Sequence, residues 1–422
     1  MADVRPPDSL AVLSMHTSPL AAPGSGDGGG LNVYVRELAV ALAHAGTSVD
    51  VYVRRAAAAR GADAPAVVDV EPGVRVVHID AGPPSLAKDD LPAVVDLYAD
   101  RVAACLARRP PAALHAHYWL SGVAGHRLKH EFDVPLAVTF HTLARVKSRS
   151  GDAEPAARAD AEQQVIDCAD VVFASGRAEA AQLQRYYDVP AERIETLTPG
   201  VDLALFSPGR RDAAQAALGL ADGAPSAGAP PVVLFVGRIQ PLKGANLAVR
   251  ALALLRSSAG RAARLLIVGG PSGPAGERTV AGLHRLVADL GLGDRVRFVP
   301  PQPHHQLSSY YRAADVCVVP SRSESFGLVA LEAAACGTAV VASDVGGLRD
   351  NVIDGVTGLL VDDRRPETFA AHVDRLLDDP QLARRLGDGG CVHAADHTWA
   401  DAAARAVEVF ARLATRELVD CA

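Results

Sequence analysis

The sequence of 422 residues contains no apolar run near the roughly 18 residues that a membrane-spanning helix requires. Residues 1–9 are polar. Together these two observations predict a cytoplasmic protein without a membrane span.

The six cysteines form no Cys-x-x-Cys pair and show no Cys/His spacing typical of a metal site. Nor does the chain contain an Asp-x-Asp metal-binding motif, so we predict no metal. We expect buried or inert thiols in a reducing cytosol. The scattered cysteines are Cys105, Cys168, Cys317, Cys336, Cys391 and Cys421.

Basic residues are outnumbered: 42 Lys and Arg stand against 49 Asp and Glu, which gives a formal net charge of −7. That balance argues against nucleic acid as a main partner. It leaves room for a local basic pocket that binds a small anionic substrate.

What is present is a regular alternation of short apolar runs with Ala/Leu-rich helical stretches, the pattern of parallel α/β sheets. The first half contains seven predicted strands: 10–15, 48–53, 74–79, 114–116, 136–140, 171–174 and 194–197. Its predicted helices are 31–45, 91–108, 157–168 and 177–187. The pattern restarts with six further strands: 232–236, 263–268, 295–299, 315–319, 339–342 and 358–361.

Between the two series, residues 208–230 have the Gly/Pro/Ala/Ser composition of a linker. We therefore predict two Rossmann-like, doubly wound domains, residues 1–207 and 231–396, that face a ligand cleft. An amphipathic helix over 399–418 is expected to return to the first domain with residues from about 397 to 422.

Two acids eight residues apart, Glu324 and Glu332, flank Gly327 and carry the strongest local signal. If one helix runs through both, their carboxylates lie roughly 12 Å apart along its axis. A glycosidase needs a separation of only about 5 to 9.5 Å. The pair instead suits two parts of one long ligand, such as a nucleotide sugar; the alternative is a solvated helix face.

Two further segments are candidates for binding phosphate. The glycines of 24–30 precede a helix, whose N-terminus favours anions, although a plain flexible loop would also fit. A nicotinamide dinucleotide site is disfavoured, because residues 16–23 separate strand from glycines and Arg54 and Arg55 stand where a ribose-binding acid belongs. Arg238 and Lys243 follow a strand and could neutralise a diphosphate; surface cations are the alternative.

Taken together, these segments resemble the retaining glycosyltransferases of the two-domain GT-B class, family 4, over nearly the whole chain. Glu-x7-Glu and Gly237-Arg238 are specific to the class. The resemblance rests on these segments: Ser14-Met15-His16-Thr17-Ser18-Pro19-Leu20, Gly26-Asp27, Asn32-Val33-Tyr34, His117-Tyr118-Trp119-Leu120-Ser121-Gly122, His141-Thr142-Leu143-Ala144, Val236-Gly237-Arg238, Gly269-Gly270-Pro271-Ser272-Gly273-Pro274 and Glu324-Ser325-Phe326-Gly327-Leu328-Val329.

The resemblance implies a role for each matching residue. For the donor, Gly30, Arg238 and Lys243 would bind the diphosphate, Glu332 the ribose, Glu324 the sugar and Gln302 the uracil through its backbone. The amides of Phe326, Gly327 and Leu328 would lie near the phosphate, and His141 near the reacting carbon. For the acceptor, Asn32 would bind inositol hydroxyls, and its phosphate would contact Lys88, Tyr118, Thr142 and Arg158.

Some of these side chains have simpler interpretations. Lys88 begins an acidic stretch, Arg158 could pair with Glu162 one helical turn on, and His141 could be a core histidine. The chain also departs from the family pattern at Arg349, where Pro is common, and at Gly28 and Gly244.

The resemblance implies transfer of N-acetylglucosamine from UDP-N-acetylglucosamine to 1D-myo-inositol 3-phosphate, as in mycothiol biosynthesis, with retention and without a cofactor. Alternatives are transfer to another phosphorylated acceptor such as a hexose phosphate, nucleotide-sugar epimerisation or hydrolysis, a nicotinamide-dependent oxidoreductase, and a non-catalytic sugar-nucleotide sensor. The expected partners are small-molecule substrates, and the family is often homodimeric.

Overall fold

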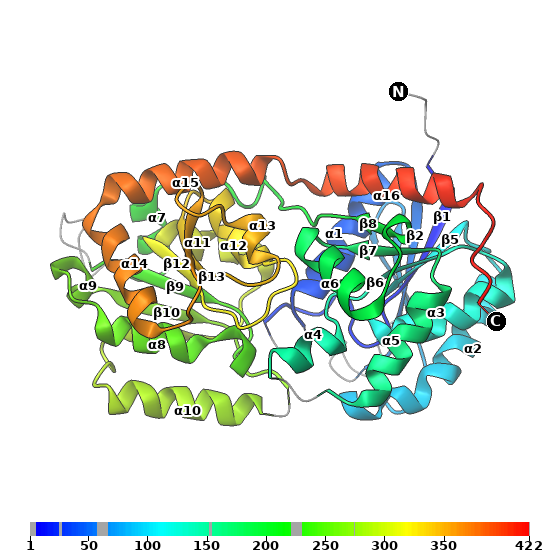
Figure 1. Cartoon of the computed structure of the whole chain (residues 1–422), viewed down its shortest axis with the longest axis horizontal. Helices are drawn as coiled ribbons and strands as arrows, with labels where there is room; N and C mark the ends of the chain where they lie inside the picture. The colour runs from blue at the N-terminus through cyan, green and yellow to red at the C-terminus, as the bar shows by residue number, and fades with distance from the viewer. Residues whose placement is uncertain are drawn as a thin grey trace. The chain divides into compact units, whose positions relative to one another are not determined.

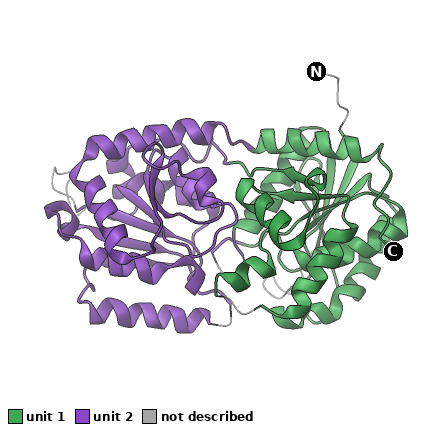
Figure 2. Ribbon diagram, in the orientation of Figure 1, with its two compact units in different colours: residues 1–21, 30–200, 399–422 green, residues 22–29, 201–398 purple. Residues whose placement is uncertain are grey.

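The computed structural model describes residues 6–24, 28–56, 66–151, 154–220, 230–273 and 275–421. The chain forms two compact units, coloured separately in Figure 2. Unit 1 comprises residues 1–21, 30–200 and 399–422, and unit 2 comprises residues 22–29 and 201–398.

Unit 1 is built on an eight-stranded sheet in the order β3-β4-β2-β1-β5-β6-β7-β8. The strands pair in parallel except β3, which lies antiparallel to β4 at one edge. The strand order reverses between β1 and β5, so this is the switch point of the sheet. The strands are β1 (Ser9–Leu13), β2 (Ser48–Arg54), β3 (Val67–Glu71), β4 (Val74–Ile79), β5 (Ala113–His117), β6 (Leu136–Thr139), β7 (Val171–Ala174) and β8 (Ile194–Thr196).

Helices cover both faces of this sheet (Figure 1). Buried Leu114 and Ala116 of β5 pack in a core with α2 and α3, while the alternate residues His115 and His117 contact rings from the other face. There α16 packs beside α1. The helices are α1 (Gly30–His44), η1 (Lys88–Val94), α2 (Val95–Leu106), α3 (Trp119–Phe132), α4 (Ala144–Arg149), α5 (Ala156–Cys168), α6 (Arg177–Tyr187), η2 (Ala191–Arg193) and α16 (Trp399–Leu413).

Unit 2 contains a six-stranded parallel sheet in the order β11-β10-β9-β12-β13-β14, with its switch point between β9 and β12. Alternate strand residues serve two cores: Val233 and Phe235 pack on one face, Val232 and Leu234 on the other. The strands are β9 (Val232–Val236), β10 (Arg264–Val268), β11 (Val296–Val299), β12 (Val316–Val319), β13 (Ala339–Ser343) and β14 (Gly358–Val361).

The helices of unit 2 divide between these two cores. Residues of α8, α10 and α14 belong to the first core, and residues of α7, α11 and α12 belong to the second. The helices are α7 (Arg211–Ala217), η3 (Pro241–Lys243), α8 (Ala245–Leu254), α9 (Ser258–Ala262), α10 (Gly276–Asp289), η4 (His304–Gln306), α11 (Leu307–Ala313), α12 (Leu328–Ala335), α13 (Leu348–Asn351), α14 (Pro366–Asp378) and α15 (Pro380–Ala395).

The predicted fold class, two doubly wound Rossmann-like domains, is confirmed. The boundary between the two units lies after residue 200 rather than after residue 207. The reason is that four residues beyond it pack in the core of unit 2: Val201, Phe206, Ala214 and Leu220. Residues 208–220 are therefore part of that unit rather than linker. The remaining linker residues 221–229 lie outside the described residues, as do Gly26, Asp27 and Pro274.

The expectation that all six cysteines are thiols is wrong for two of them. Cys168 at the end of α5 forms a disulfide with Cys421 near the end of the chain, 253 positions away. The separation hides this pair in the sequence, because only the return of the chain end to unit 1 brings the two together. Cys105, Cys317, Cys336 and Cys391 are free, as predicted.

Among the described residues, no helix combines the length and the apolarity that crossing a bilayer would need.

The final helix supplies buried rings to unit 1. Phe410 of α16 is 1% exposed and packs against Phe173 and His115, with ring centroids 5.9 Å apart in both cases. We predict that Phe410→Ala lowers the free energy of unfolding by about 3–5 kcal/mol, because it leaves a cavity in the core. Urea unfolding followed by tryptophan fluorescence checks this, since Trp119 and Trp399 both belong to unit 1.

Leu97→Ala is the matched control, because Leu97 is an apolar side chain of the same unit that is 38% exposed. Its truncation should cost much less. Equal losses for the two variants would contradict a core role for α16.

Candidate functional site

In unit 2, an ion pair joins the two sides of the switch point. Lys243 follows β9 and Glu324 follows β12, and the Lys243 Nζ lies 2.6 Å from the Glu324 Oε2. The Ser321 hydroxyl donates to the same oxygen at 3.1 Å. The turn after Lys243 requires glycine: Gly244 has φ 74°, and a Cβ there would lie 2.2 Å from the Pro320 carbonyl oxygen.

The predicted helix through both acids is wrong. Helix α12 begins at Leu328, with Gly327 (φ 94°) before it, so Glu324 lies in the preceding loop and only Glu332 is helical. The Gly346 and Gly347 segment holds this loop, since the Gly347 N–H donates to the Glu324 carbonyl at 3.0 Å. The separation of roughly 12 Å between the Glu324 and Glu332 carboxylates, which was calculated from helical rise, therefore does not apply.

Glu332 is buried and accepts two hydrogen bonds from ring side chains. The Tyr311 hydroxyl lies 2.7 Å from its Oε2, and His304 Nε2 lies 2.7 Å from its Oε1. Burial, and then the charge of Glu332, raises the pKa of Tyr311 well above its usual range, so this hydroxyl keeps its proton. The two contacts fix the position of this carboxylate in the middle of α12.

Arg238 lies beside the glycine-rich segment, which belongs to unit 2 rather than to the first domain. A Cβ on Gly29 would lie 3.1 Å from the Arg238 Nε, and the Arg238 Nη1 donates to Ser272 Oγ at 3.2 Å. The segment is pinned at its start, because the Gly270 N–H donates to the Gly24 carbonyl at 3.0 Å.

The other predicted donor residues lie on the same unit, with Gly30 and His141 as the exceptions. Gln302 follows β11, and its side chain donates to the Pro300 carbonyl at 2.9 Å. Phe326 is buried, and its carbonyl accepts from Asn351 Nδ2 at 2.6 Å. Gly30 is the first residue of α1 and belongs to unit 1.

In unit 1, the predicted acceptor residues Lys88 and Arg158 both lie over the ring of a third, Tyr118. Tyr118 directly follows β5, with the unusual φ of 73° for a residue other than glycine. The Lys88 Nζ lies 5.6 Å and the Arg158 guanidinium carbon 4.9 Å from its ring centroid. His16, which follows β1 across the switch point, packs its ring 4.3 Å from that of Tyr118.

Arg158 is buried and held by several acceptors. Its Nε lies 2.8 Å from Glu162 and its Nη1 2.7 Å from Glu154, while its Nη2 donates to the Thr142 carbonyl and hydroxyl at 2.8 and 3.1 Å. The predicted pairing of Arg158 with Glu162 one turn on is thus confirmed. Lys147 also pairs with Glu154, so this carboxylate bridges two cations.

Three histidines of unit 1, His115, His117 and His141, contact one another through their rings. His115 and His117 of β5 have ring centroids 4.1 Å apart, and His117 Nδ1 lies 2.9 Å from the Nε2 of His141. Burial lowers the pKa of His141 to about 3, and burial together with His141 lowers that of His115 to about 3. His141 has φ 60° and packs edge-on against Tyr34 of α1, 4.9 Å between centroids.

Asn32 is buried in α1, and its side-chain amide donates to the Thr17 hydroxyl at 2.7 Å and to the Ser18 carbonyl. It therefore orders the loop that carries His16.

The sequence alone predicts no role for four residues that the fold places at these sites: His16, His117, His304 and Tyr311. His16 and His117 lie inside segments that carry the family resemblance. Because alternate residues of a strand point to the same face, the sequence could also have paired His115 with His117. His304 and Tyr311 carry no such signal, because only the fold places them beside Glu332.

The buried histidines make unit 1 sensitive to acid. Their folded pKa values lie below the unfolded value of about 6.5, so the unfolded state binds protons first as the pH falls. We predict that stability is full above about pH 6.5 and decreases toward pH 3, each histidine adding at most about 1.4 kcal/mol per pH unit. Urea unfolding of unit 1 at a series of pH values measures the slope.

His115→Gln should reduce that slope, whereas His44→Gln should leave it unchanged, because the His44 side chain is 69% exposed. Equal slopes in the two variants would refute this source of acid sensitivity.

Both halves of the chain match known protein families. Residues 29–200 match the model of the glycosyl transferase 4-like domain, and residues 222–391 match that of glycosyl transferases group 1. The chain is 47% identical over 413 residues to a D-inositol 3-phosphate glycosyltransferase of Nocardia farcinica, covering 96% of this chain and 89% of that protein. It is also 47% identical over 406 residues to the protein of that name from Mycolicibacterium smegmatis, with coverage of 94% and 89%.

Among solved structures, the sucrose-phosphate synthase of Thermosynechococcus elongatus has a TM-score of 0.88 and 34% identity, covering 96% of this chain and 99% of that one. Anabaena HepE in complex with UDP and glucose shares the fold, with a TM-score of 0.74, 18% identity and coverage of 95% and 98%. With two matching domain models and relatives of this similarity along nearly its whole length, the chain belongs to the GT-B glycosyltransferases of family 4.

Proposed function

We propose that this glycosyltransferase moves N-acetylglucosamine from UDP-N-acetylglucosamine to 1D-myo-inositol 3-phosphate, with retention of the anomeric configuration. The names of the Nocardia farcinica and Mycolicibacterium smegmatis relatives support the acceptor. The HepE complexes with UDP and with UDP-glucose support a uridine nucleotide in this fold, and the N-acetylglucosamine group follows from the family resemblance.

The observation that carries the proposal is the cluster of Lys88 and Arg158 over the Tyr118 ring, with Thr142 hydrogen-bonded to Arg158. The Lys88 cation and the hydroxyls of Tyr118 and Thr142 suit the oxygens of a phosphate monoester. A neutral polyol would need no such charge. Lys88 is exposed, whereas Arg158 is buried among Glu154 and Glu162, so Lys88 contributes the accessible charge and Arg158 orients Thr142.

On the donor side, Arg238 and Lys243 neutralise the diphosphate that leaves. The bond from the anomeric carbon to the diphosphate oxygen breaks while a bond to the acceptor hydroxyl oxygen forms on the same face. The departing oxygen accepts the hydroxyl proton. The protein then contributes position and charge stabilisation, with Glu324 on the sugar and Glu332 on the ribose.

Transfer to a hexose phosphate is the second candidate, and the similarity to sucrose-phosphate synthase favours it. Both candidates share a phosphorylated acceptor and differ in its ring. Product analysis with UDP-, GDP- and ADP-sugars against inositol 3-phosphate and hexose phosphates separates them. The NMR coupling of the anomeric proton in the product reports retention or inversion.

Removal of either donor cation should abolish most turnover. We predict that Arg238→Ala and Lys243→Ala each lower kcat by about 10²–10³-fold, since each withdraws charge stabilisation from the departing diphosphate. UDP release in the presence of acceptor measures this. Arg250→Ala is the matched control, because Arg250 is an exposed cation of the same unit on α8, and it should keep normal turnover.

Removal of the exposed acceptor cation should act on acceptor binding. We predict that Lys88→Ala raises the KM for inositol 3-phosphate by about 10- to 100-fold, the loss expected for one hydrogen bond to a charged group. The Kd for UDP should stay unchanged, and Lys88→Arg should recover part of the affinity. An unchanged KM in Lys88→Ala would show that the acceptor phosphate does not bind at this cluster.

A further inference from the structure

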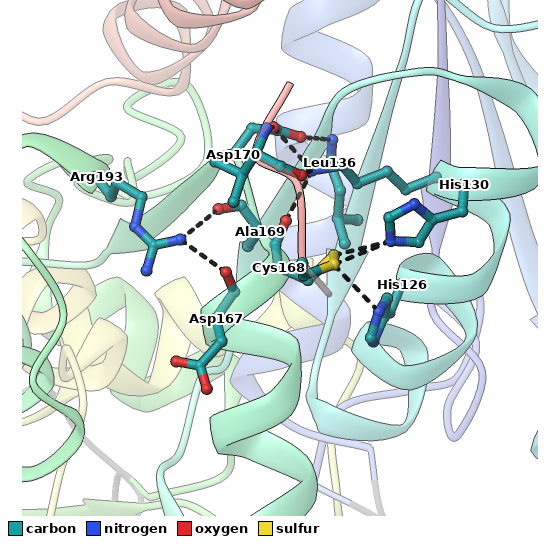
Figure 3. The surroundings of a disulfide bond; sticks show 11 residues. His126, His130, Leu136, Asp167, Cys168, Ala169, Asp170 and Arg193 are labelled. Carbon is teal, nitrogen blue, oxygen red and sulfur yellow. Dashed lines mark hydrogen bonds and ion pairs between the residues drawn. A yellow bond between two sulfur atoms is a disulfide. The ribbon is translucent and has the colours of Figure 1, made fainter. Parts of the chain in front are cut away.

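Four side chains with metal-binding chemistry converge in unit 1 at the end of the chain. His126 and His130 lie one turn apart on α3, Cys168 ends α5, and Cys421 is in the tail after α16. One ligand atom from each lies within 4.8 Å of all the others. His130 Nε2 lies 3.2 Å from the Cys168 sulfur and 3.0 Å from the Cys421 sulfur, and His126 Nε2 lies 3.5 Å from the latter (Figure 3).

The tail is held beside α3 by contacts that do not involve sulfur. The Lys129 ammonium, 2% exposed, donates to the Val419 and Cys168 carbonyls at 2.8 Å and pairs with Asp170 at 2.9 Å. The Val419 N–H donates to the same Asp170 carboxylate at 2.7 Å. Cys421 is therefore placed next to the histidines by a buried network, whether or not its sulfur is bonded to Cys168.

We propose that His126, His130, Cys168 and Cys421 form a Zn²⁺ site when the Cys168–Cys421 disulfide is reduced. Two imidazole nitrogens and two thiolates are a common ligand set for structural zinc. Zinc–nitrogen bonds of about 2.0 Å and zinc–sulfur bonds of about 2.3 Å place tetrahedral ligands roughly 3.3–3.8 Å apart. The nitrogen-to-sulfur distances of 3.0–3.5 Å are close to that range.

The chemistry balances with a dithiol as the reductant. Two electrons and two protons from the dithiol convert the disulfide into two thiols, and the dithiol becomes a cyclic disulfide. Zn²⁺ then binds both sulfurs and both imidazoles, and the two thiol protons are released. Two thiolates neutralise the ion, so the half-buried site carries no net charge.

A disulfide alone would not need this arrangement. It has no requirement for nitrogen ligands, yet two imidazoles one helical turn apart both direct Nε2 to sulfur. Zinc would fasten the last residues of the chain to α3 and α5 in a reducing compartment, where a disulfide does not persist.

The test uses the full-length protein, reduced with a dithiol, separated from the reductant under nitrogen and then incubated with Zn²⁺. After desalting, elemental mass spectrometry should find one zinc per chain in the reduced protein and none in the oxidised one. Co²⁺ in place of Zn²⁺ should give the intense visible bands of a tetrahedral site and a thiolate-to-cobalt charge-transfer band.

His126→Ala/His130→Ala and Cys421→Ser should each lose the metal and the cobalt bands, with transferase activity retained. The matched control is His393→Ala/His397→Ala, which removes another histidine pair one turn apart, near the free Cys391 in the sequence, and should retain both the metal and the activity. Absence of zinc in the reduced protein, zinc binding that survives loss of His126 and His130, or loss of zinc in the control would overturn the proposal. If the histidine variant fails to fold, Cys421→Ser decides alone.

Discussion

Polar groups at the carboxyl edge of a parallel sheet need partners, and in both units these partners come from across the switch point. In unit 2, the loop after β9 supplies Lys243 and the loop after β12 supplies Glu324. In unit 1, His16 after β1 packs on Tyr118 after β5. At a switch point the connections of the two neighbouring strands run to opposite faces of the sheet, and ligands of such folds bind at that edge. Among the candidate site residues, Lys243, Glu324 and Tyr118 lie in the segments that follow the strands at these two points.

Much of this arrangement could be predicted from the sequence. The apolar runs at 171–174, 232–236 and 358–361 coincide with the strands, because strands buried on both faces are continuous in hydrophobicity and are bounded by polar loops. Among the site residues, Lys88, Tyr118, Thr142 and Arg158 were identified through the family pattern, and the fold does bring them together.

The rest depended on tertiary contacts that leave no local pattern. Glu324 falls outside α12 because the helix begins only after Gly327, whose φ is 94°, and because Gly347 binds the preceding loop through the Glu324 carbonyl. Strand β3 alternates in exposure along its length and lies at the sheet edge, so its apolar signal is weak. The Cys168–Cys421 pair and the two histidines beside it come from three separate segments.

The return of the chain end to unit 1 has a consequence for synthesis on the ribosome. Residues 30–200 leave the ribosome well before α16, yet α16 covers part of the sheet face that bears His115 and Phe173. Unit 2 is complete once residue 398 has emerged, before the first unit has its final helix. The N-terminal half must therefore wait, with part of an apolar surface uncovered, and is exposed to chaperones and to aggregation for longer than the half that follows it.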